Sequence, residues 1–116
     1  MTALYCWQPT LPLDPREEVF YDQVLALHQR PRPIPSGELL AFAGDLLVQY
    51  RDLTKADETL WGDGPLAGNI LGKFINMSLT WPQYEEALPS VVATAARHGL
   101  HCYDPQTSEF YPAPGT

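Results

Sequence analysis

The 116-residue sequence has few positive charges and no long apolar run. Seven Lys and Arg residues stand against 14 Asp and Glu residues, which gives a net charge of −7. A surface of that sign repels phosphate backbones, so we expect no nucleic-acid binding. No stretch approaches the roughly 20 apolar residues that a membrane span needs. The first seven residues lack the positive charge of a signal peptide, and we expect a cytoplasmic protein.

Cysteine is also scarce. Cys6 and Cys102 are the two cysteines, and their separation fits neither a CxxC redox pair nor a zinc ligand set. Buried, reduced thiols are the usual state in a cytoplasmic protein. A disulfide stays open as an alternative if the two residues lie on neighbouring strands.

The composition is that of a packed globule. Hydrophobic residues make up 45% of the chain and charged residues 18%, a balance that disordered chains lack. A chain of this length forms one domain. We assign it to residues 1–111 and expect a flexible tail over residues 112–116.

The first half of the chain predicts one strand and two helices. An apolar, aromatic run indicates a central strand over residues 3–7. Asp14-Pro15-Arg16-Glu17 is typical of a helix start and predicts a helix over residues 15–28. Alternating prolines make residues 30–35 a stiff connector. Ser36 then opens a second helix that ends near residue 53.

The second half predicts three strands and one helix. We expect a short strand over residues 59–61, a glycine-rich loop over 62–69, and one long strand over 70–80, where apolar residues alternate. A third helix follows, with a kink near Pro89, and His98-Gly99-Leu100 is typical of its end. Residues 100–103 form the last strand, and residues 109–111 resume an extended pattern.

This order favours an α+β fold. It matches a ferredoxin-like split βαβ sandwich with an extra helix, containing a four-stranded antiparallel sheet and about three helices. The first and last strands pair at the centre of such a sheet. Cys6 and Cys102 would lie there.

No motif predicts catalysis. His98, His101, Cys102 and Asp104 have donor atoms that metals bind, but adjacent residues on a strand point to opposite faces, which argues against a shared ion. An apolar strand does not activate Cys102 as a nucleophile. The glycine-rich loop lacks the Gly-Lys-Ser/Thr ending of a phosphate-binding loop. We therefore expect no catalytic residue, no metal, no cofactor and no enzymatic activity.

Aromatic residues flanked by carboxylates occur in two segments. Such surfaces suit a basic protein partner, because the rings supply contact area and the charges set orientation. The predicted partner-binding residues are Asp57, Glu58, Trp61, Asp63, Tyr103, Asp104, Glu109 and Tyr111.

Residues 93–106, with the sequence ATAARHGLHCYDPQ, carry a resemblance to a family. Their helix, Gly-Leu, strand and Asp-Pro-Gln ending resembles small bacterial immunity proteins of interbacterial toxin systems, such as those of type VI secretion effectors. The resemblance implies a cytoplasmic protein that binds a cognate toxin domain and occludes its active site. It carries over no catalytic residue.

Two other hypotheses stay open. The chain could be a small enzyme or ligand-binding domain of the ferredoxin-like type, with a cavity that uses His98, His101, Trp61 and Tyr103. It could also be an adaptor whose exposed aromatic residues form a homodimer.

Overall fold

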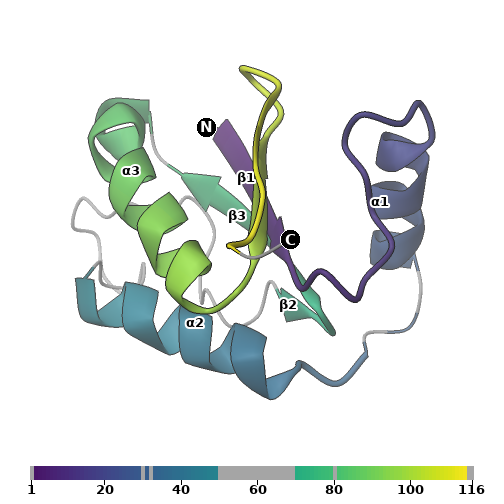
Figure 1. The fold of residues 1–116 in the computed structure, drawn as a ribbon, viewed down its shortest axis with the longest axis horizontal. Coiled ribbons are helices and arrows are strands. Elements are labelled where there is room, and N and C mark those ends of the chain that lie inside the picture. The colour runs from purple at the N-terminus through teal and green to yellow at the C-terminus, as the bar shows by residue number, and fades with distance from the viewer. Residues whose placement is uncertain (1, 30, 32, 50–69, 80, 115–116) are drawn as a thin grey trace.

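The computed structural model describes residues 2–29, 31, 33–49, 70–79 and 81–114. Within these residues the chain is an α+β protein with three helices and one five-stranded sheet. The elements in chain order are β1 (Thr2–Trp7), α1 (Phe20–Gln29), α2 (Gly37–Gln49), β2 (Ile70–Leu71), β3 (Phe74–Leu79), α3 (Trp81–Arg97), β4 (His101–Asp104) and β5 (Glu109–Tyr111). Every neighbouring pair of strands is antiparallel, and the strand order is β2-β3-β1-β4-β5 (Figure 1).

Helices cover both faces of the sheet, so the protein has two apolar cores. Helices α2 and α3 lie on one face, and α1 lies on the other (Figure 1). Because side chains alternate along a strand, β1 contributes to both cores. Leu4 and Cys6 pack with α2 and α3, whereas Trp7 packs with Phe20 and Val24 of α1.

Strand β1 occupies the centre of the sheet, as its doubly apolar sequence predicted. It pairs with β3 on one side and with β4 on the other. In the pairing with β4, Cys6 lies directly opposite Cys102, and both are buried free thiols without a disulfide between them. The predicted pairing of the first strand with the strand after the third helix is confirmed.

The prediction of one long strand over residues 70–80 was wrong, and so was the number of four strands. Gly72 adopts a φ of 65° and turns the chain between β2 and β3, which pair Leu71 with Phe74. Only glycine takes that conformation readily, and a glycine first in a two-residue loop is typical of a hairpin. Residues 109–111, predicted only as an extended pattern, form β5 and pair with β4, so the sheet has five strands. The predicted strand over residues 59–61 lies outside the described residues.

The first helix begins later than predicted. Residues 14–17 form a turn in which Asp14 accepts hydrogen bonds from the Arg16 backbone and side chain, and the Glu17 N–H donates to the Asp14 carbonyl. A second turn joins Glu17 to Phe20, where α1 starts. The Asp14 carboxylate therefore stabilises a turn, not a helix N-terminus.

The other two predicted helices are present, and the predicted start at Ser36 and the predicted helix end at Gly99 are confirmed. Ser36 Oγ accepts the Leu39 N–H at the start of α2. At the end of α3, Gly99 has a φ of 67°, and the Leu100 N–H reaches back to the Ala95 carbonyl. No helix in the described ranges is long and apolar enough to cross a membrane.

Candidate functional site

Half of the predicted partner-binding residues belong to one hairpin, β4–β5. Tyr103 and Asp104 are buried, whereas Glu109 is exposed and Tyr111 is half-buried. The remaining four predicted residues, Asp57, Glu58, Trp61 and Asp63, lie outside the described residues. Within the hairpin, alternation separates Tyr103 from the others: it packs in the core beside α1, while Tyr111 packs against the core beside α2 and α3.

The Asp-Pro-Gln segment has a structural role. Asp104 Oδ1 accepts the Gln106 N–H at 2.9 Å, which closes the turn after β4. The Gln106 side chain then bonds the Ala3 backbone twice, accepting from its N–H at 3.0 Å and donating to its carbonyl at 2.9 Å. A side-chain amide thus continues the backbone pairing of β1 beyond the end of β4. The hydrogen bonds of Asp104 and Gln106 therefore account for this segment as part of the fold, as the helix end at Gly99 does for the residues before it.

Asp104 also has an oxygen that the turn does not use. Its side chain is fully buried, and Oδ2 has no hydrogen-bond partner among the described residues. Asp104 pairs across the hairpin with Glu109, so two carboxylates lie on the same face of adjacent strands. Burial raises the pKa of Tyr111, and the charge of Glu109, the hydrogen bond that the Tyr111 hydroxyl donates to Glu109, and the charge of Asp104 add to the shift. Tyr111 therefore lies within the electrostatic reach of both carboxylates.

Three tyrosines cluster where α1 meets the opposite face of the sheet. The hydroxyls of Tyr21 and Tyr103 lie 3.4 Å apart. That hydrogen bond, with a smaller contribution from burial, raises the pKa of Tyr21 to about 12. Burial raises the pKa of Tyr5 as well, with Tyr103 adding to it. The raised pKa values keep the phenols of Tyr5 and Tyr21 protonated at neutral pH, so both can donate hydrogen bonds and neither supplies a base.

An acidic and apolar surface leads from this cluster along α1. Tyr21 is 50% exposed and Leu25 is 55% exposed, and Glu17, Glu18 and Asp22 are exposed beside them in the sequence. We call these five residues the α1 surface. The ion pairs within the described ranges do not involve its carboxylates. This surface was not predicted, although Tyr21 followed by Asp22 is the same pattern of an aromatic residue beside a carboxylate that predicted the other partner-binding residues.

A pocket of about 430 Å³ separates the start of this surface from the hairpin. Its lining comes from the segment before α1 and from β4, β5 and the residues after them: Leu13, Asp14, Arg16, His101, Phe110 and Pro112. His101 Nδ1 accepts the N–H of the buried Ala113 at 2.8 Å. Burial lowers the pKa of His101, which keeps the ring neutral at pH 7. The pocket therefore lies between the segment before α1 and the hairpin, and its lining residues are not those of the α1 surface.

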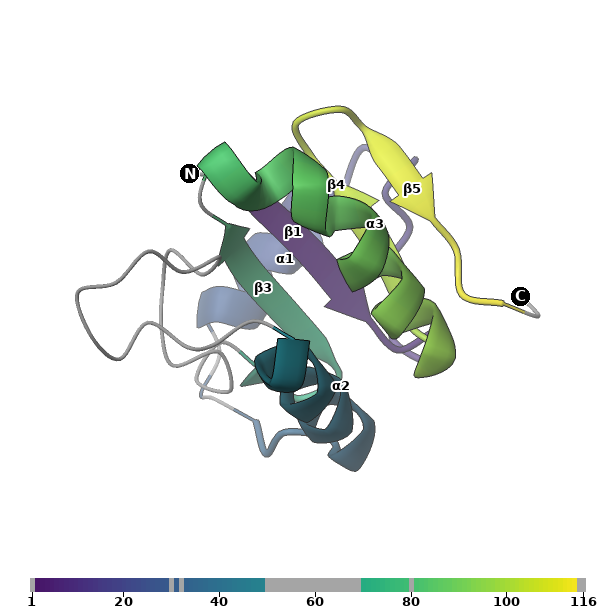
Figure 2. The ribbon, with the colours of Figure 1, turned by 90° about the vertical axis from the view of Figure 1, so that its left-hand side faces the viewer.

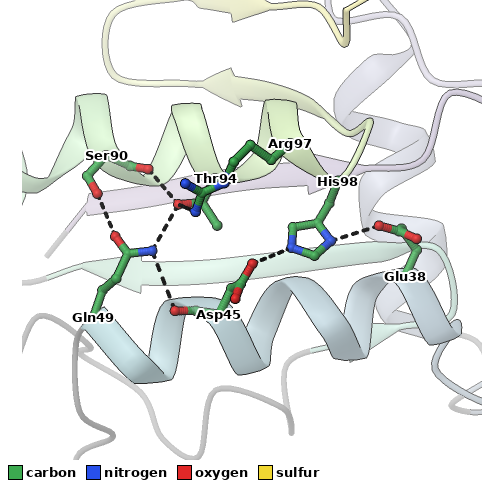
Figure 3. A network of polar contacts seen from close by, with 7 residues as sticks. All are labelled: Glu38, Asp45, Gln49, Ser90, Thr94, Arg97 and His98. Carbon is green, nitrogen blue, oxygen red and sulfur yellow. Dashed lines mark hydrogen bonds and ion pairs between the residues drawn. The ribbon is translucent and has the colours of Figure 1, made fainter.

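His98 does not line this pocket; it follows the last residue of α3 and connects that helix to α2. Its Nδ1 is 2.8 Å from Glu38 Oε1, and its Nε2 is 2.7 Å from Asp45 Oδ2 (Figure 3). Burial lowers the pKa of His98, but the hydrogen bonds with Asp45 and Glu38 outweigh it and the net pKa is raised. Both ring nitrogens are engaged, so neither is available as a catalytic base.

A second set of polar contacts continues this connection along the two helices. The Gln49 side chain of α2 accepts from Ser90 Oγ at 2.7 Å and donates to Thr94 Oγ1 at 3.2 Å (Figure 3). Ser90 and Thr94 belong to α3. The network as a whole is a clamp between two helices, and the sequence analysis did not predict it.

The donor atoms considered for a metal do not converge. His98 faces α2, and His101 lines the pocket. Cys102 lies in the core beside α2 and α3. In the part of the chain that the structure describes, no three His, Cys, Asp or Glu side chains could hold an ion. Burial, together with the hydrogen bond to Cys102, raises the pKa of the Cys6 thiol well above its ordinary value. That shift disfavours the thiolate that nucleophilic chemistry needs.

Comparison with known proteins gives a partial similarity. Over 98 residues the chain is 30% identical to the chloroplastic stearoyl-(acyl-carrier-protein) 9-desaturase of Elaeis guineensis var. tenera. The alignment covers 63% of this chain and 25% of the desaturase, so the chain spans about a quarter of that relative's length. No family model matches the chain, and no solved structure matches it. The similarity does not assign the chain to a family.

Proposed function

We propose that this protein works by binding a basic protein, and that the partner is a bacterial toxin domain which it occludes as an immunity protein. The observation that carries the proposal is the α1 surface, where Tyr21 and Leu25 are half-exposed and Glu17, Glu18 and Asp22 are exposed close to them in the sequence. Exposed apolar area supplies affinity, and the surrounding carboxylates select a partner of opposite charge.

The charge of the whole chain supports the same partner class. A net charge of −7 attracts basic proteins over a distance and speeds their association. Toxins that act on nucleic acids or nucleotides need basic active sites, because their substrates are anions. An acidic inhibitor suits such a site, and the resemblance of residues 93–106 to immunity proteins points the same way.

Two finer features belong to this proposal. We propose that the architecture is ferredoxin-like, since the order β2-β3-β1-β4 is that of a split βαβ sandwich in which α2 and α3 are the two crossover helices. Helix α1 and strand β5 are then additions, and α1 contributes Tyr21, Asp22 and Leu25 to the proposed binding surface. We also propose a cytoplasmic location, in line with a toxin that acts inside the cell.

The direct test is affinity capture of the tagged protein from its native cells at low and high salt, followed by mass spectrometry. We expect one stoichiometric basic partner, recovered less well at high salt because screening weakens the attraction. Co-expression with the captured protein should then rescue growth. A partner whose recovery ignores salt, or growth that is not rescued, would contradict the proposal.

Two variants assign the binding to the α1 surface. Glu17→Lys with Asp22→Lys reverses charge beside Tyr21, and we expect capture to fail. Glu85→Lys with Glu86→Lys changes the net charge by the same amount on exposed positions of α3 and should leave capture largely intact. Equal loss in both pairs would mean that net charge alone, and not this surface, attracts the partner.

The pocket beside His101 favours a second function, the binding of a small molecule. Its volume of about 430 Å³ falls within the range of ligand sites. A thermal-shift screen with nucleotides and metabolites tests this alternative, because a ligand that binds the folded state raises Tm. A compound that raises Tm of the native chain but not of Phe110→Ala would support this function. No rise in Tm with any compound would count against it.

A further inference from the structure

The face of the β4–β5 hairpin that lies toward α3 carries two carboxylates without a matching cation in the described part of the chain. Asp104 on β4 and Glu109 on β5 are direct partners across the strands, and like charges in that relation destabilise a sheet. Tyr111, two residues along β5 from Glu109, lies on the same face. Figure 2 shows this strand at the edge of the sheet, beside α3.

Asp104 makes the arrangement more costly. Its side chain is fully buried and one of its oxygens, Oδ2, has no hydrogen-bond partner among the described residues. A buried polar atom without a partner destabilises a fold, because it loses its hydrogen bonds to water and gains none within the protein. An asparagine could close the same turn through its own Oδ1. The turn therefore needs the acceptor oxygen of Asp104 but not its negative charge.

We infer that Asp104, Glu109 and Tyr111 form a binding site for an arginine side chain. Glu109 is exposed, and its carboxylate, which already accepts a hydrogen bond from the Tyr111 hydroxyl, keeps further lone pairs with which a guanidinium can pair. The half-buried ring of Tyr111 offers a face on which the planar guanidinium stacks. The charge of Asp104 lies behind them in the protein interior, where water screens it little, and it adds attraction without direct contact.

The inference rests on the proposed function only for the source of that arginine, which is the surface of the basic partner. The recognition of a guanidinium is a property of the hairpin itself. It can be measured with a peptide, whether or not the partner is known. Failure of the inference and failure of the proposed function are therefore distinguishable.

The experiment is an NMR titration of the full, isotope-labelled chain with the capped peptide Gly-Arg-Gly. Its control is the same peptide with citrulline, which keeps the shape of arginine and removes its charge. We expect saturable shifts at the amides of Asp104, Glu109 and Tyr111 with arginine, and none with citrulline. Equal responses to the two peptides would overturn the inference.

Three substitutions sharpen the test. Glu109→Gln should weaken arginine binding roughly tenfold, the loss of a bidentate charged pair. Asp104→Asn should weaken it about threefold and leave the turn closed. Glu86→Gln, at an exposed position of α3, is the matched control and should leave it unchanged. If Asp104→Asn does not fold, the comparison of Glu109→Gln with Glu86→Gln decides the question, and equal affinities overturn the inference.

Two further outcomes decide between sources of charge. Saturable binding of calcium chloride at the same amides, in competition with the arginine peptide, would replace the arginine site by a metal site and overturn the inference. Capture of a basic partner that binds Glu109→Gln as tightly as the native chain would overturn it while leaving the proposed function intact. Arginine binding without a captured partner would support the inference and count against the proposed function.

Discussion

The clamp between α2 and α3 predicts that stability depends on pH through one histidine. His98 donates to two carboxylates at once, to Glu38 at 2.8 Å and to Asp45 at 2.7 Å. An imidazole donates from both nitrogens only when it is protonated. Replacing it in His98→Gln keeps a polar side chain of similar reach and removes the charge.

The magnitude follows from the exposure of the partners. The side chain of His98 is 16% exposed, but those of Glu38 and Asp45 are 43% and 49% exposed. Water therefore screens both pairs, and each contributes about 0.2–1 kcal/mol and not the larger value of a buried pair. The two together stabilise the fold by roughly 0.5–2 kcal/mol. At about 4 °C per kcal/mol for a domain of this size, Tm should fall by about 2–8 °C.

The sign of the pH dependence is fixed by the direction of the pKa shift. The pKa of His98 is raised above its ordinary value of 6.5, so folding favours the protonated ring. The stabilisation is then fully present below that ordinary value and is lost as the pH rises through the higher pKa of the folded state. The difference in Tm between the native chain and His98→Gln should be largest near pH 5.5 and small near pH 9.

Thermal unfolding followed by circular dichroism from pH 5.5 to 9 measures this difference. Glu38→Gln with Asp45→Asn, in the presence of native His98, should remove the same pH dependence from the acceptor side. A difference in Tm that is constant over the whole range, or that grows with pH, would refute the assignment of a protonated clamp.

Three further substitutions test the turns. In urea unfolding, Gly72→Ala should lower the free energy of unfolding by about 2–3 kcal/mol, because φ is 65° and the new Cβ would lie 3.1 Å from Pro33 Cγ. Gly99→Ala should lower it by about 1–2 kcal/mol, because φ is 67° but no described atom beyond its chain neighbours lies within 4 Å of the new Cβ. Equal costs would contradict the contact with Pro33. Gln106→Ala should cost about 1–3 kcal/mol and speed hydrogen exchange at the Ala3 amide, and an unchanged exchange rate would contradict its bonding to β1. Ser108→Gly should raise stability by up to about 1 kcal/mol, because Ser108 has a φ of 58°; a lower Tm would mean that its side chain contributes more than the strain costs.

Features set by neighbouring residues could be predicted from the sequence. The Ser36 cap and the Gly99 helix end both depend on contacts within five residues, and both are confirmed. The central position of β1 also followed, since a strand that is apolar on both faces must be covered twice. The turn at Asp104 is equally local, because Asp and Pro at a strand end favour it.

The hairpin at Gly72 could not be predicted from alternation. Helices cover both faces of the sheet, so Ile70 and Leu71 are buried in either register. The apolar pattern then reads the same for one long strand as for two short ones. Only the φ of Gly72 distinguishes them, and a glycine within a strand pattern indicates that choice without deciding it.

The polar contacts of His98 could not be predicted either, because its partners are distant in the sequence. Glu38 and Asp45 precede it by 60 and 53 residues. They meet it only because α2 and α3 pack side by side on one face of the sheet. For the same reason Tyr21 was missed, since its role depends on the 3.4 Å approach of Tyr103 from β4.

The polar groups of the described chain divide by whether the fold satisfies them. His98 and Gln106 have every strong contact that their geometry allows, and both join separate elements. Asp104 and Glu109, in contrast, face each other without a described cation, one of them buried. The turn after β4 uses one oxygen of Asp104 and Glu109 accepts a hydrogen bond from Tyr111, but neither contact neutralises the two charges. A cation supplied by another molecule would offset this like-charge pair, which is the role we propose for arginine.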